Sequence, residues 1–536
     1  MATVSHTSLH SRLTGISLFG DRVVQFRGLK FASVPRRFAR AELFEGYPSE
    51  LDCTRHGPIC PQEPTSLESD LFGIPAPLQK GKLGLTFDEL ECLNLAVTLP
   101  KSHVPNILSG KKLPVLVSIH GGSNRVGAGC SSLQDPAGLS AASVTEGKEV
   151  ICVAINYRLN VFGYGVLPDG EGSNNGLFDQ QIALVWVKRH ISGFGGDPGN
   201  TTLAGESAGS LGVDAQLHAS SPIGRGLFKR AIMQSGCLDT GAPKPREKMI
   251  QTTRRVADFL ERGSGEKDED WVEKLRNASV RELVSASIKA KVGMWCVSDD
   301  GTFFTSPWDQ AAGIPDWCES LIIGDCDFET PTQGFVWYLQ IAPASAAIIH
   351  QAFTGVQPHN TRVLEAYKVP APAPDSASAL RAAAFAFIGD SVFSYPAHKL
   401  ASRWRSAGKR VYEYCFDQPN PYTPEFRRAH HGVDLLYLYP GYELPEKDRV
   451  VAEAFQKHVL EFCHSGNAWK ASDGQVMGYG PAGEVRIVEK KERRRVAEWE
   501  ASLEFLRRAE LPKAIEYVKE YLGAAKRAIE GETVIG

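Results

Sequence analysis

The chain has 536 residues, a net charge of −3 and 43% hydrophobic residues, enough apolar material for a large core. Its near-neutral charge excludes the basic field that nucleic-acid binding requires. The sequence contains no run of about 18 uncharged apolar residues, the length that a membrane span needs. Its first residues also lack the apolar segment of a secretory signal. We therefore expect one elaborated α/β domain over 1–536 and a cytoplasmic location, with the oligomeric state left open.

A buried strand followed by two glycines is the first informative pattern. Leu113–Ile119 is a short, mostly apolar run and predicts a strand. His120, Gly121 and Gly122 follow it directly. Glycines at this place leave backbone N–H groups free to point at a substrate oxygen, so Gly121 and Gly122 are candidate oxyanion-hole residues. An ordinary strand-end turn is the alternative interpretation.

A second pattern, Gly205–Gly209, supplies a candidate nucleophile. Its sequence Gly-Glu-Ser-Ala-Gly follows the β-prone run Thr201–Ala204 and precedes residues that favour a helix. A sharp strand-to-helix turn presents its serine above the sheet edge, and the flanking glycines allow neighbouring backbone to pass closely. Ser207 is the predicted nucleophile, and the N–H of Ala208 is a third candidate donor to the oxyanion. The alternative is a chance pentapeptide in a chain with 51 glycines.

These motifs and several longer segments resemble the type-B carboxylesterase/lipase family, which includes the cholinesterases and several fungal lipases. The resemblance covers roughly residues 13–470 and implies the α/β-hydrolase fold. In that fold a large, mostly parallel twisted sheet is flanked by helices, with an N-terminal hairpin at about 19–35 and a flap at about 61–91. The other matching segments are Asn156–Leu159, Phe162–Gly163, Asn175–Gln181, Phe194–Pro198, Gly226–Ile232 and Gln234–Gly236.

The resemblance also assigns the acid of a catalytic triad. In the family a Glu lies five residues after a glycine that ends a strand, and here Glu329 lies five residues after Gly324. The residues on either side of Glu329 differ from the usual family pattern. Asp325 and Asp327 therefore remain alternatives, and a surface carboxylate is the non-catalytic interpretation.

His431 is the base that the resemblance implies. It opens the sequence His-Gly-Val-Asp-Leu, which matches the family pattern, in a loop after the predicted strand Arg410–Phe416. His430 is the neighbouring alternative, which we expect to face solvent or to contact the loop. Glu206 and Ser235 are expected, by resemblance, to lie directly behind the triad.

Eleven cysteines cannot all pair within one chain, and none has the spacing of a metal site, so we expect no metal and no other cofactor. Cys60 and Cys92 resemble a loop-closing pair of the family and are a candidate disulfide, which a reducing cytosol would keep open. The C-terminal part, about 490–536, begins with the basic run Lys490–Arg495 and predicts a helix with a solvated charged face. A partner or membrane surface is the alternative for this helix.

Together these residues predict a serine carboxylic-ester hydrolase that acts through a Ser-His-Glu triad on a small or medium neutral ester or lactone. An acyltransferase or lactone-forming enzyme would use the same acyl-enzyme and remains an alternative. A non-catalytic, cholinesterase-like interaction protein is a second alternative, although such proteins usually lack a triad member. The flap at 61–91 contains no tryptophan, so we expect no preference for choline esters.

Overall fold

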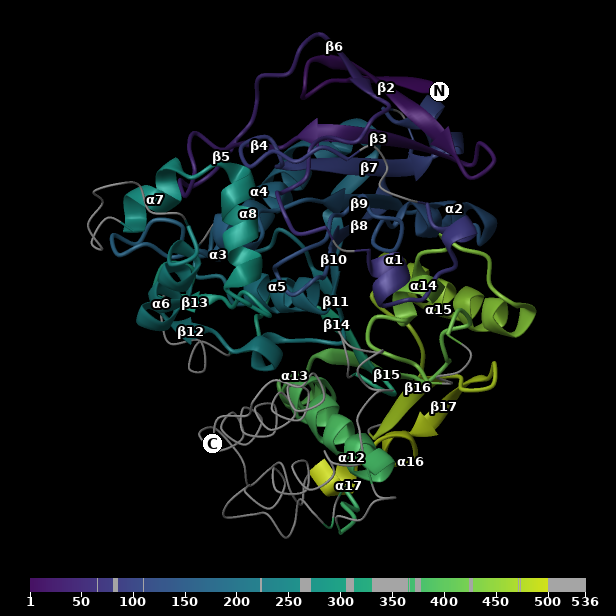
Figure 1. The fold of residues 1–536 in the computed structure, drawn as a ribbon. Helices are drawn as coiled ribbons and strands as arrows, with labels where there is room; N and C mark the ends of the chain where they lie inside the picture. The colour runs from purple at the N-terminus through teal and green to yellow at the C-terminus, as the bar shows by residue number, and fades with distance from the viewer. Residues whose placement is uncertain are drawn as a thin grey trace.

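A large mixed sheet dominates the computed structural model, which describes residues 1–499 apart from 65, 81–84, 109, 222–223, 261–270, 305–312, 330–364, 366, 372–376, 424–427, 471 and 473. Within these ranges thirteen strands form the sheet, in the order β1-β2-β3-β7-β9-β8-β10-β11-β14-β15-β16-β17, with β6 beside β2 (Figure 1). Every neighbouring pair from β9 to β16 is parallel. The prediction of a large, mostly parallel sheet is confirmed.

The sheet strands include the predicted ones, and β8 has the predicted bounds. They are β1 (Ala2–His6), β2 (Ser11–Leu18), β3 (Val23–Lys30), β6 (Glu50–Cys53), β7 (Asn94–Pro100), β8 (Leu113–Ile119), β9 (Ile151–Ile155), β10 (Gly196–Glu206), β11 (Arg230–Gln234), β14 (Ser320–Cys326), β15 (Arg410–Phe416), β16 (Gln475–Tyr479) and β17 (Val485–Glu489). Two small sheets pair β4 (Ala32–Ser33) with β5 (Glu42–Leu43), and β12 (Lys244–Pro245) with β13 (Ser298–Asp299). The antiparallel pair β2–β3 forms an N-terminal hairpin over 11–30, so the hairpin begins before the predicted range of about 19–35 and only its turn and second strand fall within that range.

Helices in the described ranges connect and cover these strands. They are α1 (Leu67–Asp70), α2 (Ala137–Thr145), α3 (Asn160–Tyr164), α4 (Asn175–His190), α5 (Ala208–Leu217), α6 (Arg246–Ala257), α7 (Trp271–Asn277), α8 (Val280–Lys289), α12 (Ala377–Gly389), α13 (Tyr395–Ser406), α14 (Asp434–Leu438), α15 (Glu446–Ser465), α16 (Lys490–Arg493) and α17 (Val496–Glu498). Most of the predicted C-terminal helix, 500–536, lies outside the described residues.

Alternate residues of the central strands fill two cores, one on each face of the sheet. In β8, Val115 and Val117 belong to the cluster that includes residues of α4, α5 and α13. Leu116, between them, belongs to the cluster that includes residues of α2, α14 and α15. Side chains that alternate along a strand point to opposite faces, so helices cover both faces of the sheet, as predicted.

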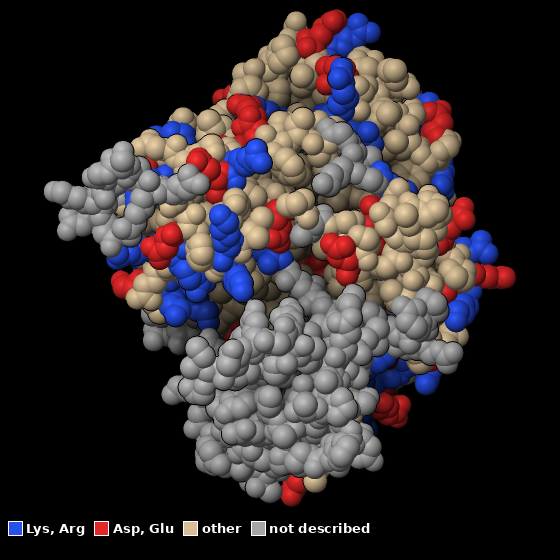
Figure 2. Space-filling model, in the orientation of Figure 1, with Lys and Arg blue, Asp and Glu red and all other residues tan. Residues whose placement is uncertain are grey.

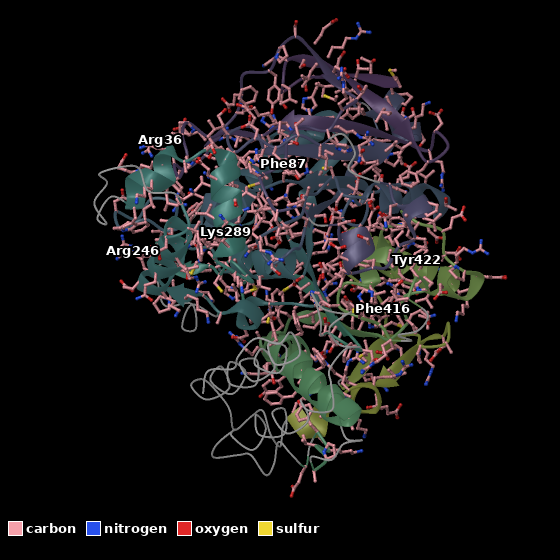
Figure 3. All side chains as sticks on the ribbon, viewed as in Figure 1. Arg36, Phe87, Arg246, Lys289, Phe416 and Tyr422 are labelled. Atoms are coloured by element: carbon pink, nitrogen blue, oxygen red, sulfur yellow. The ribbon has the colours of Figure 1, made fainter. Side chains whose placement is uncertain are left out.

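The carboxyl end of β15 is fixed deep in the second of these cores. Phe416, the last residue of β15, is labelled in Figure 3. Its ring contacts those of Tyr437 and Phe455, with centroids 4.9 and 5.7 Å apart. Such aromatic pairs stabilise a core beyond the area they bury. The loop that leaves β15 toward His431 therefore starts from a rigid point.

Candidate active site

The predicted site residues lie on loops that leave the same edge of the sheet. Because β8, β10, β11, β14 and β15 are parallel neighbours, their carboxyl ends lie side by side, where open α/β sheets bind ligands. The residues that follow these ends are Gly121 and Gly122 after β8, Ser207 after β10, Ser235 after β11, Glu329 after β14 and His431 after β15.

Ser207 occupies a sharp turn between β10 and α5. Its φ of 54° and ψ of −122° form a backbone conformation that costs a non-glycine residue about 1–3 kcal/mol. The turn is tight, because a Cβ on Gly205 would lie 2.4 Å from the backbone of Gly209. A Cβ on Gly209 would lie 2.1 Å from the carbonyl oxygen of Ile119. The two glycines of the sequence motif are therefore required by close backbone contacts on both sides of the serine.

The loop after β8 passes beside this serine. A Cβ on Gly121 would lie 3.3 Å from the Cβ of Ser207. Gly122 has a φ of 112°, and its carbonyl accepts the N–H of Val126 at 3.0 Å, which turns the loop back on itself. Within the described part of the chain, the N–H groups of Gly121, Gly122 and Ala208 donate no hydrogen bond. Unpaired amides next to a nucleophile are suited to bind an oxyanion.

His431 and Glu329 form a direct hydrogen bond. The distance from His431 Nδ1 to Glu329 Oε2 is 2.6 Å. The other oxygen, Glu329 Oε1, accepts the N–H of Cys326 and the hydroxyl of Ser235, both at 2.7 Å. Glu329 is buried, so both carboxylate oxygens are satisfied away from solvent. A carboxylate held in this way fixes the orientation of the imidazole, with Nδ1 as the donor.

The opposite nitrogen of His431 lies near a second buried carboxylate. His431 Nε2 has no hydrogen-bond partner among the described residues, and Glu206 Oε1 lies 3.2 Å from it. Burial lowers the pKa of His431, but the hydrogen bond and charge of Glu329, with the charges of Glu206 and Asp434, raise it above the usual 6.5. Burial is also the main cause that raises the pKa of Glu206, against the opposing charge of His431. The imidazole of His431 therefore loses its proton, and becomes able to act as a base, only at a pH above the ordinary pKa of histidine.

Comparison with known proteins shows the family to which this chain belongs. The model of the carboxylesterase family matches residues 2–482. The chain is 33% identical to Lipase 3 of Yarrowia lipolytica over 503 residues, which cover 92% of this chain and 95% of the lipase. The chain belongs to the carboxylesterase family. Family and relatives make it a carboxylic ester hydrolase, as predicted.

This carboxylesterase is also similar to bacterial esterases in sequence and in structure. It is 28% identical to the para-nitrobenzyl esterase of Bacillus subtilis over 494 residues, which cover 86% of this chain and 90% of that esterase. A solved carboxylesterase structure from Geobacillus stearothermophilus superposes with a TM-score of 0.72 at 24% identity, covering 93% of this chain and 100% of that one. The predicted α/β-hydrolase fold is confirmed.

The two alternative acids of the carboxylesterase are held by arginines. Asp327 Oδ2 accepts Arg428 Nε at 2.7 Å, and Asp325 Oδ1 accepts Arg494 Nε at 3.0 Å. Burial opposes ionisation of Asp327, but the hydrogen bond and charge of Arg428 lower its pKa. Of these three carboxylates, at the end of β14 and in the loop after it, Glu329 is the one that contacts His431.

His430 does not face solvent; it is 0% exposed and contacts its own loop. Its Nδ1 lies 2.9 Å from the carbonyl oxygen of His431, which only accepts, so Nδ1 is the donor. Its Nε2 accepts the side-chain amide of Asn420 at 2.8 Å, and its ring meets Phe72 edge-on. Burial lowers the pKa of His430 to about 4. The sequence held no signal for this role, because a histidine suits a surface and a buried loop equally well.

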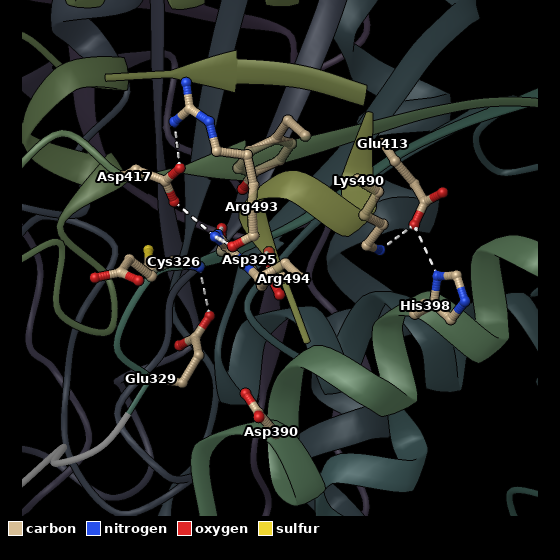
Figure 4. A network of polar contacts seen from close by, with 12 residues as sticks. Asp325, Cys326, Glu329, Asp390, His398, Glu413, Asp417, Lys490, Arg493 and Arg494 are labelled. Atoms are coloured by element: carbon tan, nitrogen blue, oxygen red, sulfur yellow. Dashed lines mark hydrogen bonds and ion pairs between the residues drawn. The ribbon is translucent and has the colours of Figure 1, made fainter. Parts of the chain in front are cut away.

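The prediction that the basic run 490–495 is solvated is wrong for Lys490 and Arg494. Both are buried. Lys490 Nζ pairs with Glu413 at 2.5 Å, while Arg494 pairs with Asp325 and Asp417 (Figure 4). Burying a charge is costly unless it is paired. Their acidic partners lie far away in the sequence, so the run alone gave no sign of its burial.

The candidate Cys60–Cys92 disulfide is open in the structure, in which all eleven cysteines are free. The two thiols are buried, and the hydrogen bond with Cys60, followed by burial, raises the pKa of Cys92. The two thiols thus interact through a hydrogen bond. The described ranges hold no group of three His, Cys, Asp or Glu side chains that could bind a metal ion. None of the described helices is long and apolar enough to cross a membrane.

Proposed function

We propose that this carboxylesterase hydrolyses small or medium neutral esters through a triad of Ser207, His431 and Glu329. His431 Nε2 accepts the proton of Ser207 as the serine oxygen attacks the ester carbonyl. The amides of Gly121 and Gly122, with that of the residue after the serine, bind the oxyanion that forms. Glu329 holds the imidazole through Nδ1 and stabilises its charge.

In the next step His431 changes from a base to an acid, and the acyl-enzyme that forms is then hydrolysed. His431 gives its proton to the leaving alcohol as the tetrahedral intermediate collapses, which leaves an acyl group on Ser207. A water molecule then attacks the acyl-enzyme, with His431 again as the base. The final collapse returns the proton to Ser207 and releases the acid.

One observation carries the proposal. A serine in a strained turn adjoins unpaired backbone amides, at the edge where His431 and Glu329 lie 2.6 Å apart. The strained turn supports the role of nucleophile, because such conformations cluster at active sites. Acidic and basic side chains are intermixed over the described part of the face that Figure 2 shows, and the flap has no tryptophan. Both features favour a neutral ester over a cationic one.

Kinetics of Ser207→Ala with p-nitrophenyl esters of increasing chain length test the proposal. We expect kcat/KM to fall by about three orders of magnitude or more, the scale for loss of a triad nucleophile. The melting temperature, which reports folding, should stay within a few degrees, because only one partly exposed hydroxyl is removed. Activity within about tenfold of the parent enzyme would contradict the proposal.

A further inference from the structure

Arg494 joins the ends of the two strands that lead to Glu329 and His431. Its Nη1 donates to Asp417 Oδ1 at 2.7 Å, just beyond β15, and its Nε donates to Asp325 Oδ1 at 3.0 Å, in β14 (Figure 4). The side chain is only 3% exposed. Burial opposes its charge, but the carboxylates of Asp325 and Asp417 hold the pKa of Arg494 above its usual value. The guanidinium is therefore a fixed positive charge between these strand ends.

One contact of this guanidinium leads directly to the proposed catalytic acid. Arg494 Nη2 donates to the carbonyl oxygen of Asp325 at 3.1 Å. That carbonyl belongs to the same peptide group as the N–H of Cys326, which donates to Glu329 Oε1 at 2.7 Å. Glu329 Oε2 in turn accepts His431 Nδ1 at 2.6 Å. A single planar peptide thus separates the arginine from the acid.

This arrangement strengthens the hydrogen bond that holds the acid. A charged donor on a carbonyl polarises the peptide, so the N–H on its other side becomes a stronger donor. The peptide between Asp325 and Cys326 is also held in place, because the guanidinium of Arg494 donates a second hydrogen bond to the side chain of Asp325. Both effects orient Glu329 and stabilise its negative charge.

We propose that Arg494 is a positioning residue for ester hydrolysis, acting on Glu329 through the peptide between Asp325 and Cys326. The inference rests on the proposed function, in which Glu329 orients His431. The residues matched by the family model end at 482. Arg494 therefore brings to the site a contribution from outside the matched part of the chain.

Arg493 offers a matched control for the loss of a buried ion pair. Its Nη1 donates to Asp417 Oδ2 at 2.5 Å and to the carbonyl of Gly480 at 2.7 Å. Among the described residues Arg493 donates to Asp417, Gly480 and Glu484, and none of these contacts involves the peptide that holds Glu329. A purely structural role for these arginines predicts similar behaviour of Arg493→Met and Arg494→Met, whereas the proposal predicts different kinetics.

The experiment compares Arg494→Met, Arg494→Lys and Arg493→Met with the parent enzyme. Melting temperature, kcat, KM and the pH dependence of kcat/KM are measured on a neutral p-nitrophenyl ester, below the unfolding range of every variant. We expect both methionine variants to melt earlier. Arg494→Met should lose kcat by about three- to tenfold with KM nearly unchanged, while Arg493→Met keeps kcat. Lysine lacks the planar fork that reaches both aspartates and the carbonyl, so Arg494→Lys should not restore kcat.

The pH profile separates positioning from stability. Without Arg494 the charge of Glu329 is less stabilised, so it attracts the proton of His431 more strongly, and the acidic limb of Arg494→Met should move to higher pH. The groups that face His431 (Glu329, Glu206, Asp434 and His430) and the Arg428–Asp327 pair beside the acid loop are the same in every variant.

Three results would overturn the inference. They are an equal loss of kcat in Arg493→Met, parent-like kcat with an unmoved acidic limb in Arg494→Met, and full recovery of kcat in Arg494→Lys. The proposed function fails separately, through an active Ser207→Ala variant in the otherwise unchanged chain. An inactive Ser207→Ala variant beside a fully active Arg494→Met variant refutes the role of Arg494 alone.

Discussion

Replacement of Glu206 by glutamine should move the acidic limb of the pH profile to lower pH. Glu206 Oε1 lies 3.2 Å from His431 Nε2, and its charge is one cause of the raised pKa of His431. At an effective dielectric constant of about 20, two unit charges at this distance attract by roughly 5 kcal/mol. That figure is an upper bound, because burial also raises the pKa of Glu206 and so reduces its charge. A nearby opposite charge shifts a pKa by about one to three units, so we expect a shift of about one to two.

The assay is kcat/KM for a neutral p-nitrophenyl ester from pH 5 to 10, which reports the pKa of the base in the free enzyme. Asp434→Asn is the graded comparison, because the charge of Asp434 contributes less than that of Glu206 to the pKa of His431. The acidic limb of the pH profile of Asp434→Asn should also move to lower pH, but by a smaller amount. An unmoved limb in Glu206→Gln, or one at higher pH, would refute this reasoning.

Three further predictions concern the acid, the core and the substrate. Glu329→Gln should lower kcat on the order of 10³-fold, since His431 loses its orienting charge, while Asp327→Asn should stay within about threefold; the reverse order would assign the acid to Asp327. Arg158→Met should lower the free energy of unfolding by about 3–5 kcal/mol, because it leaves the buried carboxylate of Asp179 unpaired; a loss below about 1 kcal/mol in denaturant titration would contradict this. The kcat/KM for butyrylcholine should not exceed that of a neutral butyrate ester by more than about tenfold, and a larger advantage would reveal a cation site.

The fold was predictable because its strands carry strong local signals. The predicted strands Leu113–Ile119 and Arg410–Phe416 have the bounds of β8 and β15. Both are short runs with β-prone residues, and such runs predict strands well. The turn at Ser207 was equally recognisable in the sequence. Close backbone contacts require a glycine on each side of the serine, and these glycines form the short motif Gly205–Gly209.

The candidate site was predictable only where a motif spans a few residues. Through the family resemblance, Glu329 was assigned by its register after Gly324, and His431 by the sequence His-Gly-Val-Asp-Leu that it opens. The structure brings these two residues within 2.6 Å of each other. The contact of Glu206 with His431 and the burial of Arg494 depend on residues more than 75 positions apart. Charge and spacing along the chain do not encode such partners, so Lys490 and Arg494 were wrongly expected at the surface.

Covalent labelling tests the central claim, that Ser207 is the nucleophile, most directly. The parent enzyme is treated with a fluorophosphonate, digested, and the modified peptide is identified by mass spectrometry. We predict one label per chain, on Ser207, with activity lost in proportion to labelling, because the strained turn holds this serine next to the unpaired amides, at the sheet edge that also carries His431. Stoichiometric labelling of another residue with the same loss of activity, or full inhibition with Ser207 unmodified, would contradict the account.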